Sequence, residues 1–355
     1  MKKLILTGLI LGMGVLPFYG KKDVRINLTE DDKVKMLNEA DDFIDEIPEG
    51  QPDRQADAIL HALQGSGAEL DAVRQSRNLT PQYSANVEVK DITPTEGSAR
   101  GIAMRLYRPK SANGKQLPLL LYFHGGGWCF GSLNSCAAYC NALASEGNVA
   151  VLAVDYSLAP ENPFPGGLSD CIAATEYAFG NSAELGTSPA LISLGGDSAG
   201  GNLALATSMY FSTNKPKDKI RSLVLYYPVV DIKNENAGSW KEFSRGYGLD
   251  RRLMDSFILG YDDKGKAADE IGNISKEVLK SPIKGDEELL KKLPPILMVS
   301  AGRDILVDQG RAFAEKVGGV ERVEFPGAVH LFITVPGQET AFRNAVEITG
   351  SFLSE

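Results

Sequence analysis

The 355-residue chain has little of what several protein classes require. Its 37 Lys and Arg against 46 Asp and Glu give a formal charge of −9, and no basic cluster stands out. Nucleic-acid-binding surfaces are usually basic, so no nucleic-acid partner is expected. The four cysteines form no C-x-x-C pair, which argues against a structural zinc site. With 43% hydrophobic and 23% charged residues, the chain instead has ample core for one large α/β domain or two smaller domains.

The first residues differ from the rest. Lys2 and Lys3 precede an uncharged stretch, Leu4 to Gly20, so residues 1–20 are predicted to be a signal peptide. The stretch is at the short limit for a spanning helix, so no stable membrane span is expected after processing. Phe18 makes a poor cleavage site, and a buried N-terminal helix is the alternative. Cleavage predicts a periplasmic or secreted protein; without it the protein would be membrane-tethered or cytoplasmic.

Two cysteines are placed where they could meet. Cys136 and Cys140 are four residues apart in an expected helix and would share one face. In an exported protein one disulfide could form among the four cysteines, although the sequence does not give the pairing. Free buried thiols that pack as small apolar groups are the other interpretation.

Residues 21–84 have a helical pattern. Thr29 is a suitable N-cap before three acidic residues, and apolar residues then recur at helical spacing up to the break at Pro48–Pro52. A second helix begins at Asp53, and a third is expected over Ala68 to Arg77. The region is acidic and holds no cluster of catalytic residue types. It is predicted to be an N-terminal helical cap segment.

The hydrophobic period changes at about residue 85. Two alternating strands are expected near residues 87–92 and 102–106, followed by short apolar runs separated by helical stretches. This pattern predicts an α/β fold with a mostly parallel sheet buried on both faces. Residues 231–292 are too long for one crossover and carry helical patterns. They are predicted to be an inserted cap segment, and residues 85–230 and 293–355 the main domain.

The sharpest motif is Gly196-Asp197-Ser198-Ala199-Gly200, the one match to G-x-S-x-G in the chain. An apolar strand precedes it and a helical pattern follows, which is the context that the motif needs to expose a nucleophilic serine. The helix N-terminus beneath the serine favours developing negative charge. Ser198 is therefore the predicted nucleophile, and the Ala199 N–H a predicted oxyanion donor.

A serine needs a base, and the chain has only three histidines. His330 follows the last strand, far C-terminal to Ser198, which fits the order serine, acid, histidine. His61 lies in the N-terminal cover and fits no such order. For the acid, Asp304 lies just past the strand at 296–299 and is favoured over Asp308, which is expected to cap the next helix.

The oxyanion loop is expected at His124-Gly125-Gly126-Gly127-Trp128, after the strand at 119–123. Gly125 and Gly126 are the predicted backbone donors, with Gly127 in support. His124 is predicted to orient this loop; it has no partner ligands for a metal, and neither metal nor cofactor is expected.

Together these motifs resemble the hormone-sensitive-lipase-like family of α/β-hydrolases, which includes many bacterial esterases. The resemblance covers most of the chain from about residue 85. It implies an α/β-hydrolase fold with an eight-stranded sheet, helices on both faces and a helical cap. It also implies a Ser198–Asp304–His330 triad, with Asp197 and Glu161 as supports. The matching segments are His124–Trp128, Asp155–Glu161, Phe164–Pro165, Gly196–Asn202, Ser281–Pro282 and Leu293–Gly310.

The chain departs from the family pattern at three places. Ser157 stands where the family usually has Arg, so one structural ion pair is expected to be absent. Leu331 and Phe332 follow the base where His-Gly is usual, and the first 20 residues are extra relative to cytoplasmic members. None of the three touches the triad.

The resemblance implies a serine carboxylesterase for small-molecule esters with short-to-medium acyl chains, acting through an acyl-enzyme. An amidase or deacetylase with the same triad would use every residue named, so it stays open. A non-catalytic small-molecule binder on the same fold is a further alternative, although a binder typically lacks the base. The sequence does not set the oligomeric state, and a dimer is one option.

Overall fold

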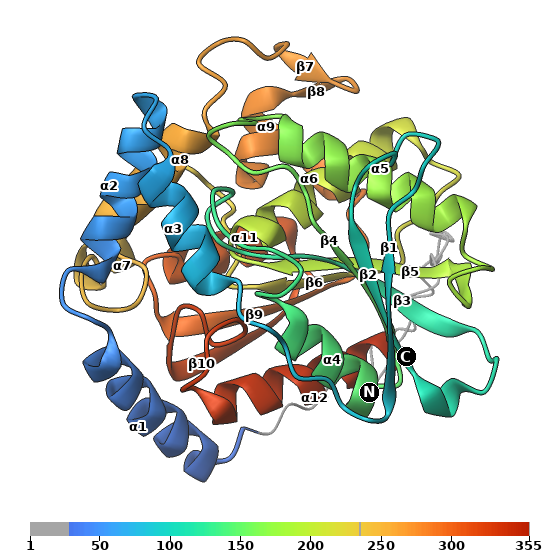
Figure 1. Cartoon of the computed structure of the whole chain (residues 1–355), viewed down its shortest axis with the longest axis horizontal. Coiled ribbons are helices and arrows are strands. Elements are labelled where there is room, and N and C mark those ends of the chain that lie inside the picture. Colours follow the sequence, from blue (N-terminus) through green and yellow to red (C-terminus); the bar gives the residue numbers. More distant parts are fainter. Residues whose placement is uncertain (1–27, 234–235, 355) are drawn as a thin grey trace, which may run out of the picture.

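The computed structural model describes residues 28–233 and 236–354, so the predicted signal peptide lies outside the described residues. Its centre is an eight-stranded sheet of order β1-β2-β4-β3-β5-β6-β9-β10 (Figure 1). Only β2 runs antiparallel to its neighbours, so the predicted mostly parallel α/β sheet is confirmed. The strands are β1 (Val87–Ile92), β2 (Met104–Pro109), β3 (Leu117–Phe123), β4 (Ala150–Val154), β5 (Thr187–Asp197), β6 (Leu223–Tyr226), β9 (Ile296–Arg303) and β10 (Glu321–Val329).

Alternation along the central strands divides the core into two layers. On β3, Leu119 and Leu121 face one apolar cluster, and Leu120 and Tyr122 face the other. The first layer is completed by helices α5, α6 and α11, and the second by α4 and α12. Figure 1 shows these two groups on opposite sides of the sheet. The helices are α4 (Ala137–Glu146), α5 (Gly166–Gly180), α6 (Ala199–Asn214), α11 (Val307–Val317) and α12 (Glu339–Ser354).

The sequence pattern predicts that residues 21–84 form one cap segment. The structure differs, because the three N-terminal helices do not all pack together. Helices α2 (Gln51–Leu63) and α3 (Ala68–Arg77) pack on each other, and α2 packs on α8 (Arg251–Tyr261). Helix α1 (Glu30–Glu46) instead lies along β10 and α12, low on the left in Figure 1. Glu39 accepts hydrogen bonds there from the Thr340 N–H and hydroxyl, at 2.8 and 2.6 Å. Helix α1 therefore belongs to the main domain, and only α2 and α3 to the cap.

The inserted segment 231–292 is divided in the same way. Helix α8 lies with the cap, whereas α9, η2 and α10 pack against α6 in the main domain. The Asn202 amide donates to the carbonyls of Val229 and Lys280 at 2.9 and 3.1 Å, which ties this second half to the helix after Ser198. The remaining elements are η1 (Lys110–Ala112), α7 (Gly238–Glu242), β7 (Glu270–Ile271), β8 (Ile274–Ser275), α9 (Lys276–Lys280), η2 (Pro282–Lys284) and α10 (Glu287–Leu290).

A buried ion pair fixes the base of the inserted segment. The Lys280 ammonium lies 3.1 Å from the Asp263 carboxylate, and both side chains are almost fully buried. Burial raises the pKa of Asp263, but hydrogen bonds from Lys280, the Ala267 N–H and Lys276 outweigh it and lower the pKa to about 2. The carboxylate is therefore ionised throughout the neutral range.

All four cysteines are buried thiols without a disulfide: Cys129, Cys136, Cys140 and Cys171. The structure thus has the free-thiol arrangement, with Cys136 as the N-cap residue of α4 and Cys140 one turn further on. In the part of the chain described, no helix is long and apolar enough to cross a bilayer.

Candidate active site

Ser198 lies on a sharp turn between β5 and α6. Its backbone has φ 53° and ψ −117°, a region that residues with a side chain rarely adopt. A Cβ atom on Gly196 or Gly200 would lie 2.4 or 1.9 Å from the Phe123 carbonyl oxygen. Both positions therefore need glycine, because the neighbouring strand β3 passes too close for any side chain. The turn carries the serine hydroxyl above the carboxyl end of the sheet.

The structure brings Ser198, His330 and Asp304 together from three separate strand ends. His330 Nε2 lies 3.1 Å from Ser198 Oγ, and His330 Nδ1 lies 2.6 Å from Asp304 Oδ2. The second carboxylate oxygen of Asp304 accepts the Leu306 N–H at 3.0 Å. All three side chains are buried, and Ser198 is only 5% exposed. With the proton on Nδ1, one tautomer satisfies both contacts of the imidazole.

Asp308, the competing acid, lies elsewhere. It is in the first turn of α11, where it accepts the Ser239 N–H at 2.8 Å and pairs with Arg311 at 2.9 Å. Its contacts are structural, and they join α11 to α7.

Two residues that no sequence motif marks hold His330 in place. Gln338 accepts the Val329 N–H at 2.9 Å and donates to the His330 carbonyl at 3.2 Å. The Tyr227 ring packs against the imidazole with ring centroids 4.3 Å apart. Nothing in the local sequence around Gln338 or Tyr227 signals these contacts, since both depend on the tertiary fold.

The oxyanion loop differs from the prediction by one residue. The Gly125 N–H donates to Asp197 Oδ1 at 2.9 Å, so it is not available to an oxyanion, and its prediction as a donor is wrong. Within the described residues, the N–H groups of Gly126, Gly127 and Ala199 have no hydrogen-bond partner. Gly126 and Gly127 have φ of 112° and 59°. The loop therefore offers these two N–H groups, with Ala199, in place of the Gly125–Gly126 pair.

The elbow and the oxyanion loop are joined through Asp197. Its Oδ1 atom accepts both the Gly125 N–H and the Tyr122 hydroxyl, the latter at 2.8 Å. Burial raises the pKa of Asp197, and the two hydrogen bonds oppose that rise. The residue next to Ser198 thus fixes where the glycine loop begins.

His124 is fully buried beside the same loop. Its Nδ1 lies 2.9 Å from the Gly125 carbonyl, and its ring stacks on Tyr156 at 4.3 Å. Because a carbonyl only accepts, Nδ1 carries the proton. Burial lowers the pKa of His124, which keeps the imidazole neutral. The third histidine, His61, lies on the exposed face of α2 beside Glu69.

Glu161 acts on the loop through an arginine. It forms a two-pronged pair with Arg74 of α3, at 2.9 and 2.8 Å. The same guanidinium donates to the carbonyls of Cys129 and Ala159, at 2.9 and 2.8 Å. Glu161 is therefore not placed against Ser198; it holds the cap helix to the end of the glycine loop. No sequence motif marks Arg74.

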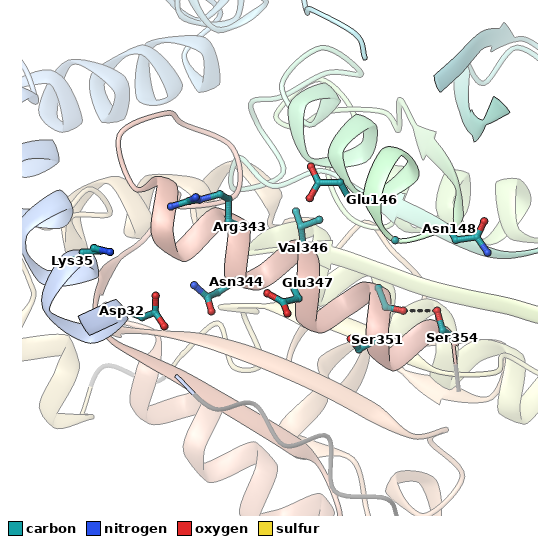
Figure 2. Close-up of a pocket in the computed structure, with 12 residues that line it drawn as sticks. Asp32, Lys35, Glu146, Asn148, Arg343, Asn344, Val346, Glu347, Ser351 and Ser354 are labelled. Atoms are coloured by element: carbon teal, nitrogen blue, oxygen red, sulfur yellow. Dashed lines mark hydrogen bonds between the residues drawn. The ribbon is translucent and has the colours of Figure 1, made fainter. Parts of the chain in front are cut away.

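A cavity of about 210 Å³ lies between the cap and the loop after His330. Its walls include Leu331, Gly248 and the end of α3. A larger hollow of about 950 Å³ lies elsewhere, between α1, α4 and α12, with charged side chains such as Lys35, Arg343 and Glu347 (Figure 2). It contains none of the triad residues. The smaller cavity also contains none of the triad residues, but Leu331 in its wall directly follows His330.

In the residues that the structure describes, no group of three or more His, Cys, Asp and Glu is placed to hold a metal ion.

The chain is similar to known proteins with this fold. Residues 120–334 match the model of a family described by its alpha/beta hydrolase fold. An arylesterase from Saccharolobus solfataricus is 33% identical over 260 residues, which are 72% of this chain and 79% of that protein. A carboxylesterase from Mycobacterium tuberculosis is 29% identical over 75% of this chain and 82% of its own length. The solved structure of an ester hydrolase from the Lake Arreo metagenome superposes with a TM-score of 0.67, at 27% identity, over 87% of this chain and 99% of that one.

The family match covers more than half of the chain, and the relatives are named for ester hydrolysis. This chain belongs to the α/β-hydrolase family, in its hormone-sensitive-lipase-like branch, and it is a carboxylic ester hydrolase.

Proposed function

We propose that Ser198 is the nucleophile, His330 the general base and acid, and Asp304 the residue that orients His330. The observation that carries this assignment is the unbroken line of contacts from Ser198 Oγ through the imidazole to the Asp304 carboxylate. The free N–H groups of Gly126, Gly127 and Ala199 supply the oxyanion site.

The proposed reaction begins when Ser198 Oγ attacks the ester carbonyl and His330 Nε2 takes the hydroxyl proton. A positioned base of this kind contributes about 10²- to 10⁴-fold to the rate. The carbonyl oxygen becomes an oxyanion at the three N–H groups, and losing one such donor typically costs about 3 kcal/mol. His330 then protonates the leaving alcohol, which leaves an acyl group on Ser198.

Water completes the cycle by the same steps in reverse. His330 takes a proton from the water as it attacks the acyl-enzyme, and it returns that proton to Ser198 Oγ when the acid leaves. Asp304 keeps the proton on Nδ1, so that Nε2 always faces the reacting oxygen. Each half of the cycle passes one proton through His330: from Ser198 to the leaving alcohol, and then from water to Ser198.

The proposed substrates carry short-to-medium acyl chains. Phe257 of the cap lies against Gly127, where a Cβ atom would come within 2.1 Å of its ring. This aromatic side chain limits the room beside the oxyanion site.

The test is hydrolysis of p-nitrophenyl esters from acetate to decanoate by the full chain. Ser198→Ala is expected to lower kcat by at least about 10³-fold. Ser208→Ala is the matched control, because Ser208 lies on the same helix with an unpartnered hydroxyl. Turnover no higher than that of Ser198→Ala would contradict the assignment. Turnover of p-nitroacetanilide in preference to the esters would favour the amidase alternative.

We also propose that residues 1–20 direct export and are then removed. The two lysines before an uncharged run support this. The mass of the protein recovered from the periplasm of a bacterial host tests it, since a full-length mass there would contradict cleavage.

A further inference from the structure

Arg77, the last residue of α3, has no hydrogen bond or ion pair within the described residues. Its guanidinium carbon lies 5.2 Å from the centroid of the Phe130 ring. Other arginines of the cap have carboxylate partners: Arg74 pairs with Glu161, and Arg252 with Asp57. Arg54 of α2 also lacks a carboxylate partner within the described residues, but it is exposed and donates to the Glu49 carbonyl at 2.7 Å.

The Arg77 side chain is half-buried. Burial lowers the pKa of Arg77, and no neighbouring carboxylate offsets that effect. An arginine stays charged in proteins even so, and its five N–H donors remain to be satisfied. The negative end of the α3 dipole favours a cation at this position. Within the described residues, however, the Arg77 side chain donates to no carbonyl of the helix end. Water or a bound anion in the cavity must therefore satisfy these donors.

Arg77 lines the 210 Å³ cavity next to the loop after His330, a cavity whose wall contains none of the triad residues themselves. One wall of that cavity is Leu331, which directly follows His330. Behind Arg77, Phe130 packs on the oxyanion loop, where a Cβ on Gly126 would lie 3.0 Å from the Phe130 Cβ. The cation thus lies between the loop that carries the base and the loop that would hold the oxyanion.

A second polar group faces the same space. Gln55 of α2 is only 7% exposed, lines the cavity, and has no side-chain hydrogen bond within the described residues. Its amide can donate two further hydrogen bonds. Glu46, the one acidic side chain in the wall, is exposed to solvent at the surface. The other lining residues are Phe43, Ile47, Pro48, Gln51, Pro52, Gly248, Leu331, Val335 and Pro336.

We propose that Arg77, with Gln55 beside it, receives a carboxylate carried by the ester substrate, so that this enzyme prefers anionic esters. This inference rests on the proposed function of Ser198 and His330. A planar guanidinium matches a carboxylate with two parallel hydrogen bonds. The small volume favours a carboxylate on a short chain over a larger anion.

Matched pairs of esters test the preference. On the acyl side, monoethyl glutarate is compared with ethyl 5-oxohexanoate, in which a methyl ketone replaces the carboxylate. On the alcohol side, 4-acetoxybutanoate is compared with 5-acetoxy-2-pentanone. In at least one pair, Arg77→Leu is expected to lower the anionic-to-neutral ratio of kcat/KM by about 10- to 100-fold. The rate on the neutral ester should change by less than about threefold, and Arg77→Lys should retain part of the ratio.

Arg54→Leu is the charge-matched control, because Arg54 is an exposed cap arginine outside this cavity. An unchanged ratio in both pairs for Arg77→Leu overturns the proposal, and so does an equal loss in Arg54→Leu. A wild-type enzyme that disfavours the anionic ester in both pairs overturns it as well.

Calorimetry separates this inference from the proposed function. Binding of monoethyl glutarate and 4-acetoxybutanoate to Ser198→Ala is measured with and without Arg77→Leu. A loss of affinity of about 10-fold or more supports the anion site even if Ser198 is not the nucleophile. Equal affinity, with neutral esters still hydrolysed in a Ser198-dependent way, rejects the role of Arg77 and leaves the proposed function intact.

Discussion

Asp197 is the contact through which the serine elbow positions the oxyanion loop, and its removal has a calculable effect. Its Oδ1 atom accepts both the Gly125 N–H and the Tyr122 hydroxyl in a fully buried position. Asp197→Ala would leave both donors without a partner, at about 1–3 kcal/mol each. The free energy of unfolding should therefore fall by about 2–6 kcal/mol, less the relief of no longer burying a charge.

The effect on catalysis should be separate from the loss of stability. Without its anchor at Gly125, the loop that carries the Gly126 and Gly127 N–H groups is free to shift. Misplacing an oxyanion donor lowers kcat by about 10²- to 10³-fold. We expect that loss in Asp197→Ala with a much smaller change in KM, because the donors act mainly on the transition state.

Two variants isolate the cause. Asp197→Asn keeps a side-chain oxygen that can accept both bonds, so its kcat should stay within about tenfold of wild type. Tyr122→Phe removes one hydrogen bond to Asp197 but does not touch the loop, and it should lower the free energy of unfolding by about 1.5–3 kcal/mol with kcat almost unchanged. Steady-state kinetics on p-nitrophenyl butyrate and urea unfolding measure both effects. A folded Asp197→Ala with wild-type kcat, or a Tyr122→Phe as impaired as Asp197→Ala, would refute the reasoning.

Three further predictions follow from contacts described above. Asp304→Asn should lower kcat on p-nitrophenyl butyrate by about 10³- to 10⁴-fold, because the imidazole loses its fixed tautomer. The control, Asp308→Asn, should keep kcat within about threefold of wild type. Equal losses in the two variants would contradict the choice of acid. The pKa of Asp263 is lowered to about 2 from an ordinary 3.8, so its ionised form contributes stability above about pH 4 that is lost as pH falls towards 2. In urea unfolding between pH 3 and 6, the free energy of unfolding should fall more steeply with decreasing pH in wild type than in Asp263→Asn. A thiol reagent should label none of the four cysteines in the native protein, because they are buried and burial raises the pKa of thiols such as Cys140. In non-reducing denaturant it should label all four. Fewer than four labelled cysteines in denaturant would indicate a disulfide.

The strands and the serine elbow could be predicted because their signals are local. An apolar run between helical stretches forms a buried parallel strand wherever it lies in the sheet. Gly196 and Gly200 flank Ser198 because of one close strand, so the motif itself carries the geometry. The order of Ser198, Asp304 and His330 along the chain then follows from the order of the strand ends.

The predictions that were wrong concern positions that look alike in the local sequence and differ only by a long-range contact. Gly125 and Gly127 look alike in sequence, and only the Asp197 carboxylate, 72 positions away, takes the Gly125 N–H out of use. Helix α1 has the same amphipathic pattern as α2, but its buried residues Met36 and Phe43 meet the main domain instead of the cap. Arg77 could not be distinguished from Arg74 at all, because having a partner is a property of the fold and not of the residue.

The clamp formed by Arg74 has a consequence for how the cap could open. This one side chain joins α3 to Glu161 and to the carbonyls of Cys129 and Ala159 by four hydrogen bonds. Lifting α3 would break all four at once, so α3 should exchange its amide hydrogens together with the glycine loop, as one cooperative unit. Local opening of the cap is then confined to elements that are not held by the Arg74 hydrogen bonds. Substrate would enter past the side of the cap away from Arg74, while the oxyanion loop stays in the same geometry through every turnover.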